Sequence, residues 1–67
     1  MEVDINGRSI QIDKEGITLA ELLSNQGFSG IGQAVAVNNK VVPRADWGSF
    51  RIESGMKLTV IRAVCGG

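Results

Sequence analysis

A single stretch of the chain, Ile17 to Phe28, has the spacing of a helix, and this stretch limits the folds open to the rest. Leu19, Leu22 and Leu23 recur at intervals of three and four residues, which gathers them on one helical face. We expect the helix to run from about Leu19 to Gln26. A helix of about two turns does not persist in water alone, so its leucines must pack on a sheet formed by the remaining residues.

Residues at both ends of this stretch are typical of helix caps. Thr18, followed three residues later by Glu21, forms a capping-box sequence, in which each side chain accepts a hydrogen bond from the backbone of the other residue. Gly27 suits the left-handed conformation that ends many helices, and Phe28 is then placed to contact Leu23 in a Schellman motif. The helix is therefore expected to begin and end sharply.

The first residues of the chain predict a β-hairpin. Apolar and polar residues alternate in "MEVDI" and again in "RSIQI", as expected for strands with one buried face. Asn6-Gly7 lies between them, and this dipeptide favours a type I′ turn because both of its residues tolerate a positive φ.

The middle of the chain predicts two further strands joined by a turn. "AVAV", residues 34–37, is a continuous apolar run, typical of a strand that is buried on both faces or closes a core. A turn is expected at residues 38–40, and "VVPR" then predicts a short strand ended by Pro43, which has no N–H for a sheet. Trp47 and Phe50 are interpreted as a cap on one end of the core, with the stacking of a ligand as the alternative for Trp47.

The final strand is expected over residues 57–64, "KLTVIRAV". Leu58 and Val60 are predicted to face the core, and Ile61 and Ala63 the opposite side. The element order is ββαβββ or ββαββ, and such a set shares one core only in an α+β fold, with the helix packed across one face of a mixed sheet.

Composition excludes several classes of function. The 67 residues allow one domain, and seven basic and seven acidic residues cancel without a run of like charge, so neither nucleic acid nor an anionic membrane is an expected partner. His and Tyr are absent and there is one Cys, so we expect no catalytic residues, no metal site and no internal disulfide. A cytoplasmic location is expected because "MEVDING" is not a signal peptide and no apolar stretch is long enough to cross a membrane.

Several motifs occur together along the whole chain: the "NG" turn, "TLAELL", "AVAVNNKVVPRADW", "ESGMKLTVIRAV" and a terminal "GG". The "GG" alone is a weak signal, since ubiquitin-like modifiers and the small subunit of molybdopterin synthase share it. Its combination with "VNNKVVPR", and with a tryptophan three residues after the arginine, is more specific. In these features the chain resembles the ThiS family, the ubiquitin-like sulfur carriers of thiamine biosynthesis with a β-grasp fold.

The resemblance implies a chemistry that resides in the carboxylate of Gly67. It implies that an E1-like adenylyltransferase of the ThiF type adenylates this carboxylate, using ATP and magnesium. A carboxylate is a poor electrophile until such a leaving group is attached, after which a sulfur nucleophile can form the thiocarboxylate. The sulfur is then delivered to a thiazole synthase of the ThiG type. ATP and magnesium belong to the activating partner, so this chain is expected to bind no cofactor and to be a carrier rather than an enzyme.

The tail residues fit this expectation in one respect and depart from it in another. We expect a β-grasp domain over residues 1–64 and a flexible tail over residues 65–67, in which Gly66 and Gly67 lack Cβ atoms and can thread a narrow channel. Cys65 is not part of the family pattern. It is interpreted as a passive residue kept reduced in the cytosol, and the alternatives are a disulfide with a partner or second copy, attack on adenylated Gly67, or a persulfide.

A carrier also needs a docking surface. Ile61 and Ala63 are the candidates, with Arg62 and Arg44 as polar contacts; the alternative is that Ile61 completes the core and the arginines are solvated. Three other functions remain open from the sequence: the small subunit of molybdopterin synthase, a protein modifier joined to lysines through Gly67, and a plain β-grasp binding module.

Overall fold

The computed structural model of the protein describes residues 1–13, 15–28 and 32–62. The elements formed by these residues are, in order, β1 (Glu2–Ile5), β2 (Arg8–Gln11), α1 (Leu19–Asn25), β3 (Gln33–Val37), β4 (Lys40–Val42), the 3₁₀ helix η1 (Arg44–Asp46) and β5 (Lys57–Arg62). Of the two predicted orders of strands and helix, ββαβββ is the observed one.

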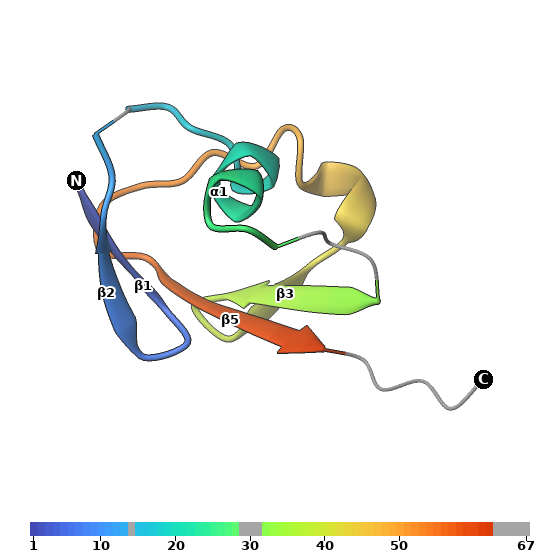
Figure 1. Ribbon diagram of the computed structural model, residues 1–67. Helices are drawn as coiled ribbons and strands as arrows, with labels where there is room; N and C mark the ends of the chain where they lie inside the picture. Colours follow the sequence, from blue (N-terminus) through green and yellow to red (C-terminus); the bar gives the residue numbers. More distant parts are fainter. Residues whose placement is uncertain (14, 29–31, 63–67) are drawn as a thin grey trace.

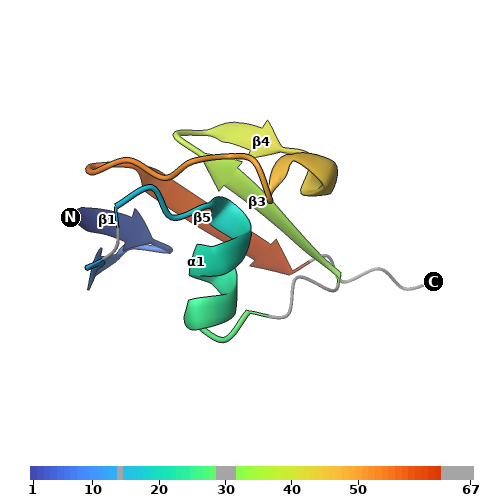
Figure 2. The same cartoon turned by 90° about the horizontal axis from the view of Figure 1, so that it is seen from above.

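The strands form one five-stranded mixed sheet in the order β2-β1-β5-β3-β4. β1 and β5 are parallel, whereas the other neighbours are antiparallel. α1 and η1 lie on the same side of the sheet, and no helix of the described residues covers its opposite face (Figure 1). From above, α1 lies across the sheet beside β5 (Figure 2). The last strand in sequence is therefore the central strand of the sheet.

Two hairpin turns use residues with positive φ. Asn6 and Gly7 join β1 to β2 with φ angles of 54° and 83°. Asn38 and Asn39 join β3 to β4 with φ angles of 51° and 68°, and Lys40 already belongs to β4. Asn and Gly adopt this left-handed region at lower cost than other residues, which explains why they occupy both turns.

α1 has both of the predicted caps. The Thr18 hydroxyl accepts a hydrogen bond from the N–H of Glu21 at 3.2 Å, and the Glu21 carboxylate accepts one from the N–H of Thr18 at 3.1 Å. At the other end Gly27 has a φ of 83°, and the N–H of Phe28 donates to the carbonyl of Leu23 at 2.8 Å, as in a Schellman motif. The helix ends one residue earlier than predicted.

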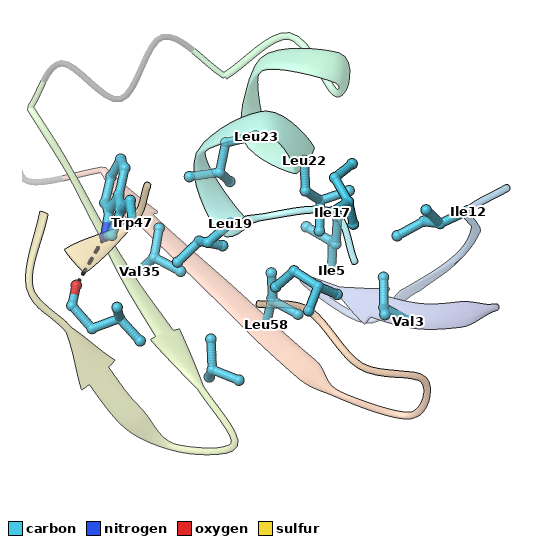
Figure 3. Packing of buried hydrophobic residues seen from close by; sticks show 13 residues of the cluster. Val3, Ile5, Ile12, Ile17, Leu19, Leu22, Leu23, Val35, Trp47 and Leu58 are labelled. Atoms are coloured by element: carbon cyan, nitrogen blue, oxygen red, sulfur yellow. Dashed lines mark hydrogen bonds between the residues drawn. The ribbon is translucent and has the colours of Figure 1, made fainter. Parts of the chain in front are cut away.

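The core lies between α1 and the sheet (Figure 3). The apolar face of α1 points at β5, and both Leu19 of the helix and Leu58 of the strand are 0% exposed. The full set of buried hydrophobic residues in the described part of the chain is Val3, Ile5, Ile12, Ile17, Leu19, Leu22, Leu23, Val35, Val37, Val42, Trp47, Ile52 and Leu58.

Trp47 closes one end of this core, as predicted. Its indole Nε1 donates to the carbonyl of Val42 at 2.9 Å, the dashed line in Figure 3, and the side chain is 6% exposed. The guanidinium of Arg44 lies 5.7 Å from the centre of the ring, within the range of a cation–π interaction. The indole N–H and the ring are therefore both in contact with other residues of the domain.

The predicted α+β architecture is confirmed, and one strand differs in detail. In β3 only Val35 and Val37 are buried, whereas Ala34 and Ala36 on the other face are half-buried. The strand is thus buried fully on one face only, because within the described residues no element covers the side of the sheet opposite α1.

Candidate functional site

The candidate site is the end of β5, the strand that leads to the residues predicted to carry the chemistry. Gly67, Gly66, Cys65 and Ala63 lie outside the described residues, as does the predicted domain boundary after residue 64. The structure therefore describes the strand that precedes the tail and the surface around it.

Ile61 lies on the face of the sheet opposite α1, as predicted. It is 53% exposed and lies opposite Ala34 of β3. Val41 of β4 lies on the same face, opposite Ala36, and is 68% exposed. Ile61 and Val41 are the exposed large hydrophobic side chains of the described residues, and the two alanines lie between their strands.

These residues lie side by side on a mainly apolar surface, which we call the outer-face patch. Its members come from three neighbouring strands and are outward-facing: Ala34, Ala36, Val41, Thr59 and Ile61. An exposed apolar surface on a small domain is typical of a site that contacts another protein. Of these members the sequence predicted Ile61, together with Ala63, which lies outside the described residues. The alternation of exposed Val41 with buried Val42 was the available signal for a second member.

The other half of the same face is polar. Asp4 of β1 lies beside Lys57 of β5 and Ser9 of β2, and the Ser9 hydroxyl donates to the Glu2 carboxylate. The face is thus divided, with charged and hydroxyl groups on β2 and β1 and apolar groups on β3 and β4. The apolar half is the part suited to burial against a partner.

The two predicted arginine contacts lie in different surroundings. Arg62 is exposed and follows Ile61 directly at the end of β5. Arg44 belongs to η1, on the helix side of the sheet, where its guanidinium lies over Trp47. Arg62 follows Ile61 in the strand, so its side chain points to the helix side of the sheet, away from Ile61. The structure therefore places neither arginine on the face that carries Ile61, and it places Arg44 against the core.

Two turn asparagines hold β5, a role that was not predicted from the sequence. The N–H of Asn38 donates to the carbonyl of Lys57 at 2.7 Å, and its side-chain oxygen accepts from the Lys57 N–H at 3.0 Å. The N–H of Asn6 donates to the carbonyl of Leu58 at 2.9 Å, and its side-chain oxygen accepts from the Val60 N–H at 2.8 Å. The strand that leads to the tail is therefore fixed from both sides.

Neither a cluster of metal-binding side chains nor a membrane-spanning helix occurs in the part of the chain that the structure describes. No cluster of three or more His, Cys, Asp or Glu side chains is placed to hold a metal ion there. Across residues 1–13, 15–28 and 32–62, no helix is long and apolar enough to cross a membrane.

Comparisons with known proteins agree along the whole chain. The sequence model of the ThiS family matches residues 2–67. The chain is 28% identical over 67 residues to the sulfur carrier protein ThiS of Escherichia coli K12, with all of both chains covered. Its fold is similar to the crystal structure of the thiamine biosynthesis protein ThiS of Geobacter metallireducens, with a TM-score of 0.87, 23% identity and full coverage of both chains. The solution structure of a thiamine biosynthesis protein from the same organism gives a TM-score of 0.77 at 23% identity, over 100% of this chain and 88% of the other. The β-grasp fold expected from the sequence is confirmed by these similarities.

Proposed function

Because this chain belongs to the ThiS family, we propose that it is a sulfur carrier of thiamine biosynthesis and that it carries sulfur as a thiocarboxylate on Gly67. The match of the family model to residues 2–67 carries this proposal. It is supported by the relative from Escherichia coli, which is named a sulfur carrier protein and is similar to this chain from end to end.

The proposed chemistry needs an activating partner. The Gly67 carboxylate attacks the α-phosphorus of ATP, pyrophosphate leaves, and an acyl-adenylate forms. A sulfur nucleophile then attacks the acyl carbon, and AMP leaves with the bonding electrons. An E1-like adenylyltransferase of the ThiF type supplies the ATP and magnesium, and a thiazole synthase of the ThiG type accepts the sulfur. The chain itself is a carrier and co-substrate in this scheme.

The length of the tail restricts where such a partner docks. Five residues, 63–67, follow Arg62. Fully extended, five residues span at most about 17 Å, so an enzyme that acts on Gly67 must contact the domain near the end of β5. We propose the outer-face patch as this contact, with Ala63 as a further apolar contact. Exposed Ile61, next to Arg62, is the observation that supports it. Arg62 and Arg44 become polar contacts only for a partner that also reaches the helix side of the sheet, where both side chains lie.

Intact-protein mass spectrometry tests the function. The chain is incubated with the E1-like enzyme, ATP, magnesium and a sulfur source, next to a variant that lacks Gly67. We expect a mass change equal to the exchange of one oxygen for one sulfur, and no change in the truncated variant. Addition of a sulfur without loss of oxygen, abolished in Cys65→Ala, would instead place the sulfur on the thiol. A ladder of heavier protein adducts in cells would indicate a modifier.

A further inference from the structure

β5 has a neighbouring strand on only part of one side. β1 pairs with it through Asp4 and Ile5 and then turns back into β2 at Asn6. On this side the last contacts are those of Asn6, whose N–H donates to the Leu58 carbonyl and whose side chain accepts from the Val60 N–H. In Figure 1 the end of β5 projects past the turn between β1 and β2.

The direction of the backbone groups follows from these contacts. Residues of an antiparallel pair alternate between those that bond to the partner strand and those whose N–H and C=O point away from it. Since the Val60 N–H points to Asn6, the Val60 carbonyl and the N–H and carbonyl of Arg62 point to the same side, away from β3. No strand of the described residues runs beside these three groups. We call them the β5 open edge.

A hollow of about 270 Å³ lies next to this edge, between the first hairpin and the end of α1. Its lining is Ile5, Asn6, Arg8, Ile10, Gln26 and Phe28. Asn6 thus lines the hollow and, through its hydrogen bond with the Val60 N–H, lies next to the open edge. Ile10 and Phe28 are half-buried apolar side chains that pack on the core, and Arg8 is exposed. The hollow is therefore suited to an apolar side chain that has an acidic neighbour.

We propose that the enzyme that acts on Gly67 adds an extended segment to the β5 open edge, in the place where β1 ends, and inserts an apolar side chain into the hollow. Unpaired N–H and C=O groups on a strand recruit a further strand through main-chain hydrogen bonds, while pockets for alternate side chains give specificity. The occupant is this enzyme because it must come within five residues of Arg62 to reach Gly67. The inference rests on the proposed function and adds the mode of binding: backbone pairing fixes the direction in which the chain leaves the domain.

A backbone ester at Arg62 tests the proposal without changing a side chain. Chemical synthesis of a 67-residue chain allows the amide N–H of Arg62 to be replaced by an ester oxygen. The matched control carries the same replacement at Ser9, whose N–H points outward from β2 because the neighbouring pair Ile5–Arg8 closes the hairpin. Each ester also makes the carbonyl of the preceding residue, Ile61 or Arg8, a weaker hydrogen-bond acceptor. Both of these carbonyls are bonded inside the sheet, so the two variants should lose a similar amount of stability.

We expect the Arg62 ester to weaken binding of the activating enzyme and to lower kcat/KM for thiocarboxylate formation, each by about tenfold, whereas the Ser9 ester matches the unmodified chain. Equal behaviour of the two esters overturns the inference and leaves the proposed function intact. Failure of the unmodified chain to gain sulfur, with an enzyme active on its own carrier, overturns the proposed function and the inference with it.

Hydrogen exchange of the unmodified chain gives a second measurement that needs no variant. Binding of the activating enzyme should slow exchange of the Arg62 amide by at least about tenfold and leave the Ser9 amide unchanged. An Arg62 amide that exchanges at the same rate in the free and bound chain contradicts strand addition, even if loading with sulfur is efficient.

Discussion

The side-chain oxygen of Asn6 accepts a hydrogen bond from the backbone N–H of Val60 at 2.8 Å, although 54 residues separate the two in sequence. Asn6 also has a φ of 54°, in the left-handed region. A single turn residue thus shapes the first hairpin and holds the strand that leads to the tail.

Substitutions at Asn6 separate these two roles. Asn6→Ala should lower the free energy of unfolding by about 2 kcal/mol, because alanine disfavours a positive φ and cannot accept the Val60 hydrogen bond. Asn6→Gly loses only the bond and should cost about 1 kcal/mol. Asn6→Asp keeps an acceptor and tolerates the same φ, so it serves as the control. Urea denaturation followed by the fluorescence of Trp47, the one tryptophan, measures all three variants. Wild-type stability of Asn6→Gly would show that the bond to Val60 contributes nothing.

The capping box of α1 provides a second test of stability. Thr18→Ala removes the hydroxyl that accepts from the Glu21 N–H at 3.2 Å, and it should cost about 1 kcal/mol. Thr18→Ser keeps the hydroxyl and should retain most of the stability. Thermal unfolding by circular dichroism compares the two. Equal melting temperatures for the alanine and serine variants would mean that packing of α1 on the sheet alone holds the helix.

Two glycines form a matched pair for measuring backbone strain. Gly55 has a φ of 87°, and a Cβ added there would meet no atom within 4 Å. Gly55→Ala should therefore destabilise the protein by about 1 kcal/mol through its backbone conformation alone. A Cβ at Gly48 also meets no atom within 4 Å, and its φ is outside the left-handed region, so Gly48→Ala should be neutral or slightly stabilising. The same sign of change in both variants, measured by urea denaturation, would contradict this explanation.

Local signals account for most of the fold that the sequence predicted. Asn6-Gly7, the capping box at Thr18 and the left-handed Gly27 each depend on neighbours within a few residues, so their structure could be recognised without knowledge of the rest. The inward position of Leu58 and the outward position of Ile61 followed from simple alternation.

The features that the sequence did not predict depend on which strands are neighbours. Val41 joins Ile61 on one surface only because β3 lies between their strands, and the Asn6 side chain reaches Val60 only because β1 lies beside β5. The half-exposed outer side of β3 has the same origin: a run of small apolar residues does not reveal whether a second layer covers it. The positive φ of a turn is by itself enough to explain an asparagine there. The sequence therefore gives no separate sign that the Asn6 side chain also bonds to β5.

The outer-face patch yields the prediction closest to function. Ile61→Asp and Val41→Asp each place a charge on a side chain that is 53% or 68% exposed, so the domain should keep its wild-type melting temperature. Affinity for the activating enzyme should fall at least about tenfold in each, because docking would bury an unpaired carboxylate. Ser54→Asp, in the exposed turn before β5, adds the same charge away from the patch and should leave affinity unchanged.

The two aspartate variants also distinguish docking of the enzyme on the outer-face patch from docking on the β5 open edge. A loss of affinity in Ile61→Asp alone would restrict the contact to the end of β5, whereas a loss in both extends it across the sheet to β4. Wild-type affinity in both folded variants would remove the outer-face patch as the docking surface. The tail would then have to be reached from another surface of the described residues near Arg62, and the β5 open edge beside Asn6 is the one proposed above. Titration of each variant against the activating enzyme by calorimetry, with the melting temperature as a check on folding, decides between these outcomes.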